Sequence, residues 1–121
     1  MPHTITPSPD RTYIELKATG EVNRAVAMRQ NVEAHALGRN LGIHRYLVDM
    51  TECRNTETEL DTYSFAYEDM MTERVDKKAR VALLVRPDDH SHDFVETVSR
   101  NAGLDVTLFR DRALAEKHLR D

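Results

Sequence analysis

The chain has 121 residues, of which 40% are hydrophobic and 31% charged, with four Gly, four Pro and one Cys. This length and composition are typical of one globular domain and exclude collagen-like, disulfide-scaffold and disordered classes. The net charge of −4 argues against a nucleic-acid-binding surface. No apolar stretch approaches the roughly 20 residues of a membrane span, and residues 1–4 open no signal peptide, so we expect a cytoplasmic protein.

The N-terminal third predicts an edge strand, a second strand and a helix. Residues 4–6 precede a Pro-Ser-Pro-Asp turn, which is too short for a crossover, so they can pair with the next strand only in antiparallel fashion. Residues 11–19 alternate between apolar and polar side chains, which predicts a strand that Gly20 closes. Apolar residues at positions 22, 25, 28, 32 and 36 predict a helix that begins at Asn23 as N-cap and ends near Gly38 or Gly42.

Two apolar runs, residues 46–48 and 81–85, predict neighbouring parallel strands in the centre of a sheet. Helices are expected at residues 59–74 and 91–102, and a last strand at residues 104–109 precedes a final helix that Asp111 caps. Because the intervening helices are long enough for right-handed crossovers, the order of elements predicts an α/β fold. We expect a mainly parallel four-stranded sheet, an N-terminal antiparallel edge strand and about four helices.

Four stretches carry a resemblance to a known family: residues 46–49 with Thr51, residues 78–85, residues 102–104, and residues 106–111 followed by Ala115 and Leu119. In order and spacing they resemble the SpoIIAA-like proteins related to STAS domains, a group of small bacterial proteins that are regulatory or uncharacterised. The resemblance implies a non-catalytic module that acts by binding a protein or a small ligand.

The chain departs from this family at its regulatory motif. In the anti-sigma-factor antagonists of the group, an Asp-Ser-Ser-Gly motif carries the serine that a kinase phosphorylates. The corresponding stretch here is Glu57-Thr58-Glu59-Leu60, which makes Thr58 the candidate phosphorylation site, although the glycine is missing and glutamates flank the hydroxyl. The alternative is that Thr58 simply caps the following helix. In the last helix, His118 stands where uncharacterised relatives often have Trp.

Polar side chains follow each central strand, where the carboxyl ends of parallel strands meet at one edge. Asp49, Thr51, Cys53 and Arg54 follow the second strand; Arg86, Asp88, Asp89 and His90 follow the third; Arg110 and Asp111 follow the fourth. Guanidinium groups bind carboxylate or phosphate, so Arg54, Arg86 and Arg110 predict an anion site. A small-molecule sensor or an enzyme at this edge is therefore the alternative function. The other interpretation is that the nearby acids pair with these arginines.

We expect no metal, no cofactor and no catalytic residue. His90 and His92 are weak metal candidates, since no distant ligand completes a set, and the plainer interpretation is a solvated turn with Asp89 or Ser91 as N-cap. Cys53 has no histidine near it in sequence, which favours a small buried thiol over a nucleophile. Phosphate loops, nucleophile elbows and CxxC motifs are absent from the sequence.

The second predicted helix carries more apolar side chains than one buried stripe needs. They are Tyr63, Phe65, Tyr67, Met70 and Met71. Aromatic residues and methionine are typical of interfaces and adaptable apolar pockets. We therefore expect a homodimer contact or a pocket wall here, with simple core filling as the alternative. The expected partners are a second copy, another protein or a small ligand, and neither nucleic acid nor membrane.

Overall fold

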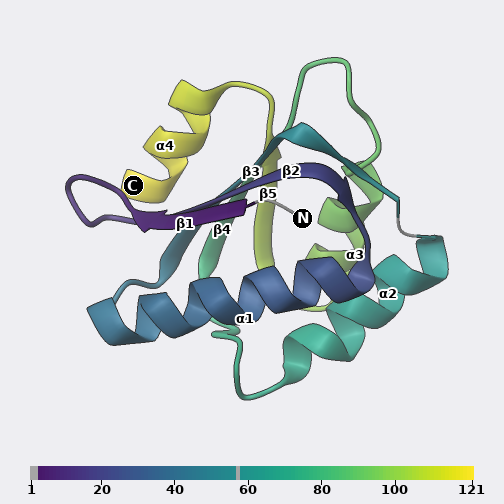
Figure 1. Ribbon diagram of the computed structural model, residues 1–121, viewed down its shortest axis with the longest axis horizontal. Helices are drawn as coiled ribbons and strands as arrows, with labels where there is room; N and C mark the ends of the chain where they lie inside the picture. Colours follow the sequence, from purple (N-terminus) through teal and green to yellow (C-terminus); the bar gives the residue numbers. More distant parts are fainter. Residues whose placement is uncertain (1–2, 57) are drawn as a thin grey trace.

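The structure is a computed structural model that describes residues 3–56 and 58–121. Its elements in chain order are β1 (His3–Pro7), β2 (Ile14–Val22), α1 (Arg24–Leu41), β3 (Arg45–Asn55), α2 (Glu59–Tyr67), the 3₁₀ turn η1 (Asp69–Met71), β4 (Arg80–Leu84), α3 (Asp93–Asn101), β5 (Asp105–Phe109) and α4 (Arg112–Arg120). Helices α1, α2 and α3 cover one face of the sheet, and α4 lies on the other (Figure 1).

The five strands form one sheet in the order β1-β2-β3-β4-β5. Strand β1 pairs with β2 in antiparallel fashion, and all other neighbours are parallel. The two apolar runs are adjacent, with Leu47 opposite Ala82 and Val48 opposite Leu83. The predicted α/β class, the antiparallel edge strand and the parallel central pair are all confirmed.

Strand β4 shows why its sequence lacks alternation. Leu83 packs in the core under α1, α2 and α3, whereas Ala82 and Leu84 pack with Leu119 of α4 on the other face. Because successive side chains of a strand point to opposite faces, a strand covered on both sides is apolar throughout.

The N-caps predicted for α1, α2 and α4 are present, but two element ends differ. The side chains of Asn23, Thr58 and Asp111 each accept hydrogen bonds from the first turn of α1, α2 and α4. Gly20 does not close its strand: β2 continues through it, with φ 85°, to Val22, after a register shift between Lys17 and Thr19. Helix α2 ends at Tyr67 rather than at residue 74, and η1 follows it.

The buried face of α1 is not the predicted one. The stripe through Ala25, Met28 and Val32 is wrong, because the helix buries Val26, Gln30, Ala34, His35 and Gly38 instead. The ring of His35 stacks on Tyr46 at 4.3 Å, and its Nδ1 accepts a hydrogen bond from the Asp76 main chain at 3.0 Å. Burial lowers the pKa of His35 to about 4, so the ring is neutral at pH 7 and can occupy the core.

Gly38 brings the last turns of α1 close to β3. The helix ends at Gly42, which adopts the left-handed conformation with φ 68°, so Gly38 lies inside the helix. A Cβ atom at Gly38 would lie 2.0 Å from Tyr46 Oη and 2.9 Å from the carbonyl oxygen of Ile43. Only glycine therefore allows this approach of helix and strand.

Gly38→Ala is expected to destabilise the protein by about 1–3 kcal/mol through overpacking. At an ordinary position inside a helix, the same substitution stabilises by roughly 1 kcal/mol, so the sign of the change is diagnostic. Urea unfolding followed by circular dichroism measures it. Adding Tyr46→Phe removes the hydroxyl in the way and should recover part of the loss. A Gly38→Ala variant as stable as the wild type would show that helix and strand do not approach this closely.

Candidate functional site

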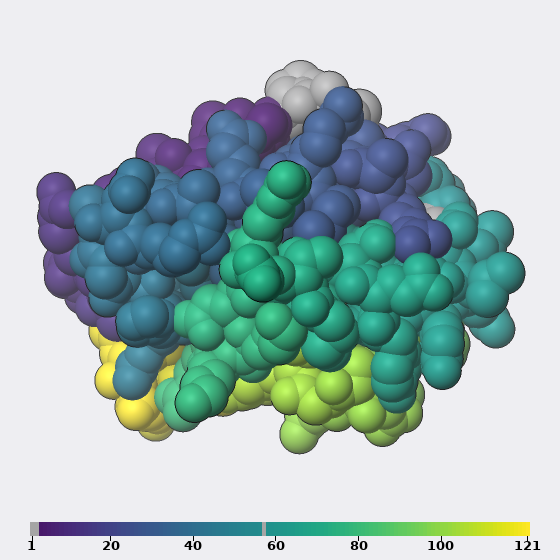
Figure 2. Space-filling model, turned by 90° about the horizontal axis from the view of Figure 1, so that it is seen from below, coloured from purple at the N-terminus to yellow at the C-terminus, as the bar shows by residue number. Residues whose placement is uncertain are grey.

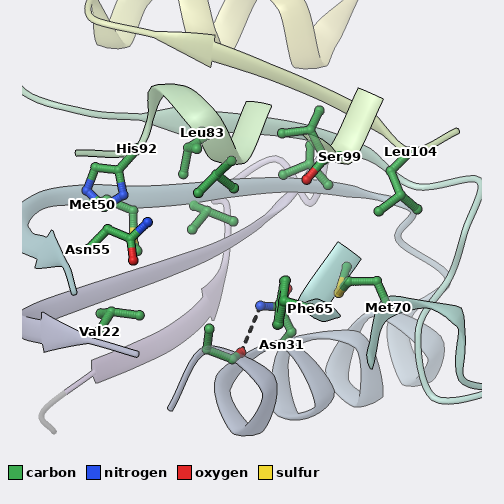
Figure 3. Close-up of a pocket in the computed structure, with 15 residues that line it drawn as sticks. Val22, Asn31, Met50, Asn55, Phe65, Met70, Leu83, His92, Ser99 and Leu104 are labelled. Atoms are coloured by element: carbon green, nitrogen blue, oxygen red, sulfur yellow. Dashed lines mark hydrogen bonds between the residues drawn. The ribbon is translucent and has the colours of Figure 1, made fainter. Parts of the chain in front are cut away.

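A cavity of about 90 Å³ lies between the sheet and helices α1, α2 and α3 (Figure 3). It is lined almost entirely by apolar side chains. From strands and loops these are Val22, Val48, Met50, Val81, Leu83, Leu104 and Val106, and from α1, α2, η1 and α3 they are Ala27, Phe65, Met70 and Val95. Val48 of β3 and Val81 of β4 both line this cavity and are only partly buried.

Four polar residues also line the cavity: Asn31, Asn55, His92 and Ser99. The Asn31 side-chain amide donates to the Ala27 carbonyl at 2.8 Å, within α1. Asn55, the last residue of β3, donates from its main chain to Ser91 Oγ at 3.3 Å and from its side chain to the Ser91 carbonyl at 3.2 Å. Asn55 and His92 lie at the same end of the cavity (Figure 3). The cavity is thus apolar, with its polar groups concentrated where α3 begins.

His92 is the N-cap residue of α3 and is only 1% exposed, so neither Asp89 nor Ser91 caps this helix as predicted. Its Nε2 lies 3.4 Å from Asp89 Oδ2, and neither atom makes a hydrogen bond. Burial lowers the pKa of His92, against the attraction of the Asp89 charge. Burial opposes ionisation of Asp89 too, but hydrogen bonds from Ser91 outweigh it and lower the pKa of that carboxyl group. The result is a buried pair with incompletely satisfied polar atoms.

Cys53 of β3 is a buried thiol in the core between the sheet and helices α1, α2 and α3. Its Sγ contacts the Met50 carbonyl at 3.7 Å and the Met50 sulfur at 3.4 Å. Burial raises the pKa of Cys53 to about 12, so the thiol stays protonated at neutral pH. The fold does bring a histidine to it, because the ring of His92 hydrogen-bonds the Cys53 main chain. A protonated thiol is a poor nucleophile, however.

The strand-end residues are only partly brought together. Strand β3 extends to Asn55 because β2 pairs with it as far as Val22. The prediction that four residues follow this strand is therefore wrong, because all of them lie inside it: Asp49, Thr51, Cys53 and Arg54. Asp49 Oδ1 accepts from the Thr51 main chain at 2.9 Å and from the Thr51 hydroxyl at 2.6 Å. Asp49 also pairs with Arg112 of α4, and this places it on the face opposite the cavity.

Two of the three predicted arginines share a site. Arg54 and Arg86 line one surface depression, which we call the strand-end depression; its other residues are Asp88, Asp89, His90 and Ser91. Arg110 does not line it and instead donates to Asp93 at 2.8 Å and to the Asp89 carbonyl at 3.3 Å. Arg86 lies 3.8 Å from Asp88.

The two weak metal candidates are not placed together as ligands. His90 is on the surface, where it pairs with Asp93 at 2.9 Å, whereas His92 is buried beside the cavity. Within residues 3–56 and 58–121, no group of three or more His, Cys, Asp or Glu side chains could hold a metal ion.

The apolar residues of the second predicted helix divide into two sets. Phe65 and Met70 are buried and line the cavity. The second set points to solvent and forms what we call the outer face of α2: Leu60, Tyr63, Tyr67 and Met71. Leu60 is 72% exposed, Tyr63 is 52% exposed, and Tyr63 stacks on Tyr67 at 4.4 Å. Helix α2 lies at the surface beside α1 (Figure 2).

Thr58, the candidate phosphorylation site of the sequence analysis, is the N-cap residue of α2. Its hydroxyl accepts a hydrogen bond from the Asp61 main chain at 3.1 Å, as an N-cap does. Glu59 and Asp61 lie in the first turn of α2. Glu57, the second glutamate predicted to flank Thr58, lies outside the described residues.

The prediction from the sequence did not include Arg112 or the polar residues that line the cavity. Arg112 pairs with Asp49 of β3 at 3.5 Å and with Glu15 of β2, and these two pairs hold α4 against the sheet; a third pair, with Glu116 at 3.6 Å, lies within α4. Only its i, i+4 spacing from Glu116 was a local signal. No local sequence signal marked Asn31, Asn55 and Ser99, because their common location depends on how the helices are placed over the sheet.

Arg112→Met is expected to destabilise the protein by about 1–3 kcal/mol, because it leaves the buried Asp49 carboxylate without its cationic partner. Asp49→Asn keeps an acceptor for Thr51 but carries no charge, so the double variant should lose less than the sum of the two single variants. Urea unfolding of all four proteins gives the coupling free energy. Additivity within about 0.5 kcal/mol would contradict the pairing.

Comparisons with known proteins bear on the fold. No family model matches the chain, and no curated protein matches it. Among solved structures, the chain is similar to an uncharacterised protein of the DUF3478 family with a SpoIIAA-like fold, from Shewanella loihica PV-4. The two share 21% sequence identity with a TM-score of 0.53, over 98% of this chain and 92% of the other. The SpoIIAA-like fold predicted by resemblance is therefore confirmed.

A search of the described residues for membrane-spanning helices finds no helix with the necessary length and apolar character.

Proposed function

We propose that the chain is a non-catalytic binding module that takes up a small, mainly apolar molecule in the cavity. The observation that supports this most is the unequal burial of the two central strands. On the α4 face, Leu47 and Ala82 are 0% exposed. On the opposite face, Val48, which follows Leu47 in β3, and Val81, which precedes Ala82 in β4, remain partly uncovered. An apolar ligand would supply the contacts that these side chains lack.

The size of the cavity limits the ligand. At about 24 cal/mol per Å³, an empty cavity of 90 Å³ costs about 2 kcal/mol of stability, which a bound apolar group would offset. An apolar cavity of about 150 Å³ holds benzene, so this one matches roughly three to five carbon atoms. Binding rather than covalent chemistry is favoured because the buried Cys53 thiol stays protonated at neutral pH.

Filling the cavity tests this proposal. Ala27 lines the cavity from α1, and Ala27→Leu places three more carbon atoms there, while Ala25→Leu makes the same change at an exposed position of the same helix. Titration with butan-1-ol should shift the Val48 and Val81 methyl NMR signals to saturation in the wild type and in Ala25→Leu, and not in Ala27→Leu. A wild type without saturable shifts, or an Ala27→Leu variant that binds equally well, would contradict the proposal.

A second candidate function, self-association, is favoured by the outer face of α2. This helix is apolar on the side of the cavity and also on the side of solvent, where Leu60 and Tyr63 are more than half exposed. Exposed aromatic and leucine side chains that lie together on a surface are typical of an interaction site. We propose that a second copy of this chain covers this face in a homodimer. Stable dimers bury about 800 Å² per partner, so the contact would extend beyond these side chains to the adjoining parts of α1 and α3.

Tyr67→Glu is expected to convert the dimer to a monomer, because it places a charge in the middle of the outer face of α2. Leu114→Glu introduces the same residue at an exposed leucine of α4, on the opposite side of the sheet, and should leave the dimer intact. Sedimentation equilibrium measures both. A monomeric wild type, or a Tyr67→Glu variant that is still a dimer, would contradict the proposed dimer interface.

A further inference from the structure

The buried pair of His92 and Asp89 connects the cavity with the surface. His92 lines the cavity (Figure 3), whereas Asp89 lines the strand-end depression. The His92 side chain is 2% exposed and that of Asp89 is 8% exposed. His92 Nε2 and Asp89 Oδ2 lie 3.4 Å apart, and both atoms are buried without a hydrogen bond. The two side chains therefore face each other between the cavity and the depression.

Both of these atoms are hydrogen-bond acceptors when the ring is neutral. Burial lowers the pKa of His92, whereas the hydrogen bond between the ring and the Cys53 main chain raises it, as a bond donated by the ring to a carbonyl group does. Because Nε2 makes no bond, the donor is Nδ1–H, and Nε2 carries the lone pair. Asp89 Oδ1 accepts from the Ser91 main chain at 2.9 Å, which leaves Oδ2 toward the ring. Two buried acceptors that face each other lack a proton between them.

The space around the pair admits a proton but no larger donor. Both atoms are covered by protein atoms, so neither a water molecule nor a polar group of a ligand reaches them. A hydrogen bond between an imidazolium and a carboxylate measures about 2.7–2.9 Å. Uptake of one proton at Nε2 would therefore draw the two side chains together by about half an ångström and form a charge-assisted hydrogen bond.

The charged groups that act on His92 differ in sign. Asp89 in the turn before α3 and Asp93 in its first turn attract a proton, and Arg86, which follows β4, repels it. The Cys53 thiol of β3 stays protonated and carries no charge. The cavity lining from β2, α1 and α2 is also uncharged: Val22, Asn31 and Phe65. Burial is the strongest influence and lowers the pKa of His92, so the ring is neutral at pH 7 and takes up its second proton below the usual range of a histidine.

We infer that His92 and Asp89 form a proton switch that couples pH to the cavity: uptake of a proton by His92 closes the pair and weakens the binding of an apolar molecule. This inference rests on the proposed function and concerns its regulation. An apolar molecule in the cavity surrounds the His92 ring with hydrocarbon, which disfavours the charged form of the ring more than the neutral form. Binding and protonation therefore oppose each other, and by linkage each weakens the other by the same factor.

Xenon is the probe, because it has no group that titrates or forms hydrogen bonds and it binds in small apolar cavities. It is titrated into the full chain from neutral pH to the acid limit of the folded state. The Val48 and Val81 methyl NMR signals report binding, and the nitrogen signals of the His92 ring report protonation. The affinity for xenon should fall about fivefold as His92 takes up its proton, and saturating xenon should lower the pKa of His92 by the logarithm of the same factor.

Three variants test which groups carry the coupling. Asp89→Asn keeps an acceptor for Ser91 but offers His92 an amide donor in place of a negative charge, so the pH dependence of xenon binding should move to lower pH. His92→Gln has no titrating group, and its affinity for xenon should be the same at every pH at which it is folded. His90→Gln removes an exposed histidine nearby and should behave as the wild type does.

The outcomes separate this inference from the proposed function. Xenon that binds equally well on both sides of the His92 titration, or more tightly to the charged form, would overturn the switch and leave the apolar site in place. A His92 ring that remains neutral until the protein unfolds in acid, or a pH dependence that persists in His92→Gln, would also overturn the switch. If xenon does not shift the Val48 and Val81 signals at any pH, the proposed function fails as well.

Discussion

Parallel pairing of β3 with β4 is the constraint on which the rest of the structure depends. Because both strands point the same way, the chain must cross over the sheet between them through α2; the parallel pairs that β3 and β4 make with β2 and β5 require the same of α1 and α3, and right-handed crossovers put all three helices on one face. The same pairing brings the ends of both strands together, so that Arg54 and Arg86 meet in one depression. The cavity and the depression are thus two consequences of one topology.

The two faces of the sheet are covered differently, and the cavity follows from that difference. On one face α4 packs directly on β3 and β4, so Leu47 and Ala82 are sealed. On the other face α2 packs mainly on α3 and α1, and at nine residues it spans only about 13 Å. Phe65 and Met70 reach toward the sheet but leave Val48 and Val81 partly uncovered. A layer of short helices over a five-stranded sheet leaves space where their ends meet.

Most features that depend on neighbours in the chain were predictable, although the N-cap of α3 was not, and features that depend on distant partners were mostly missed. The caps at Asn23, Thr58 and Asp111 need only the next turn of helix, and they are correct. The buried face of α1 was wrong because His35 is accommodated by stacking on Tyr46 and by the Asp76 main chain, which lie far along the sequence. Arg110 lies beside the depression rather than in its lining, because its guanidinium donates to Asp93 of α3, an acid that strand direction alone does not place there.

The sequence by itself determined the α/β class, the central strands and the meeting of Arg54 with Arg86, because hydrophobic periodicity and strand direction are local properties of the chain. The tertiary structure alone decided that Val48 and Val81 face a cavity, that Asn55 and His92 close one end of it, and that Asp49 lies on the opposite face with Arg112. Periodicity states which side of a helix or strand is buried. It does not state how far the helix stands from the sheet, and that distance is set by the packing of all side chains together.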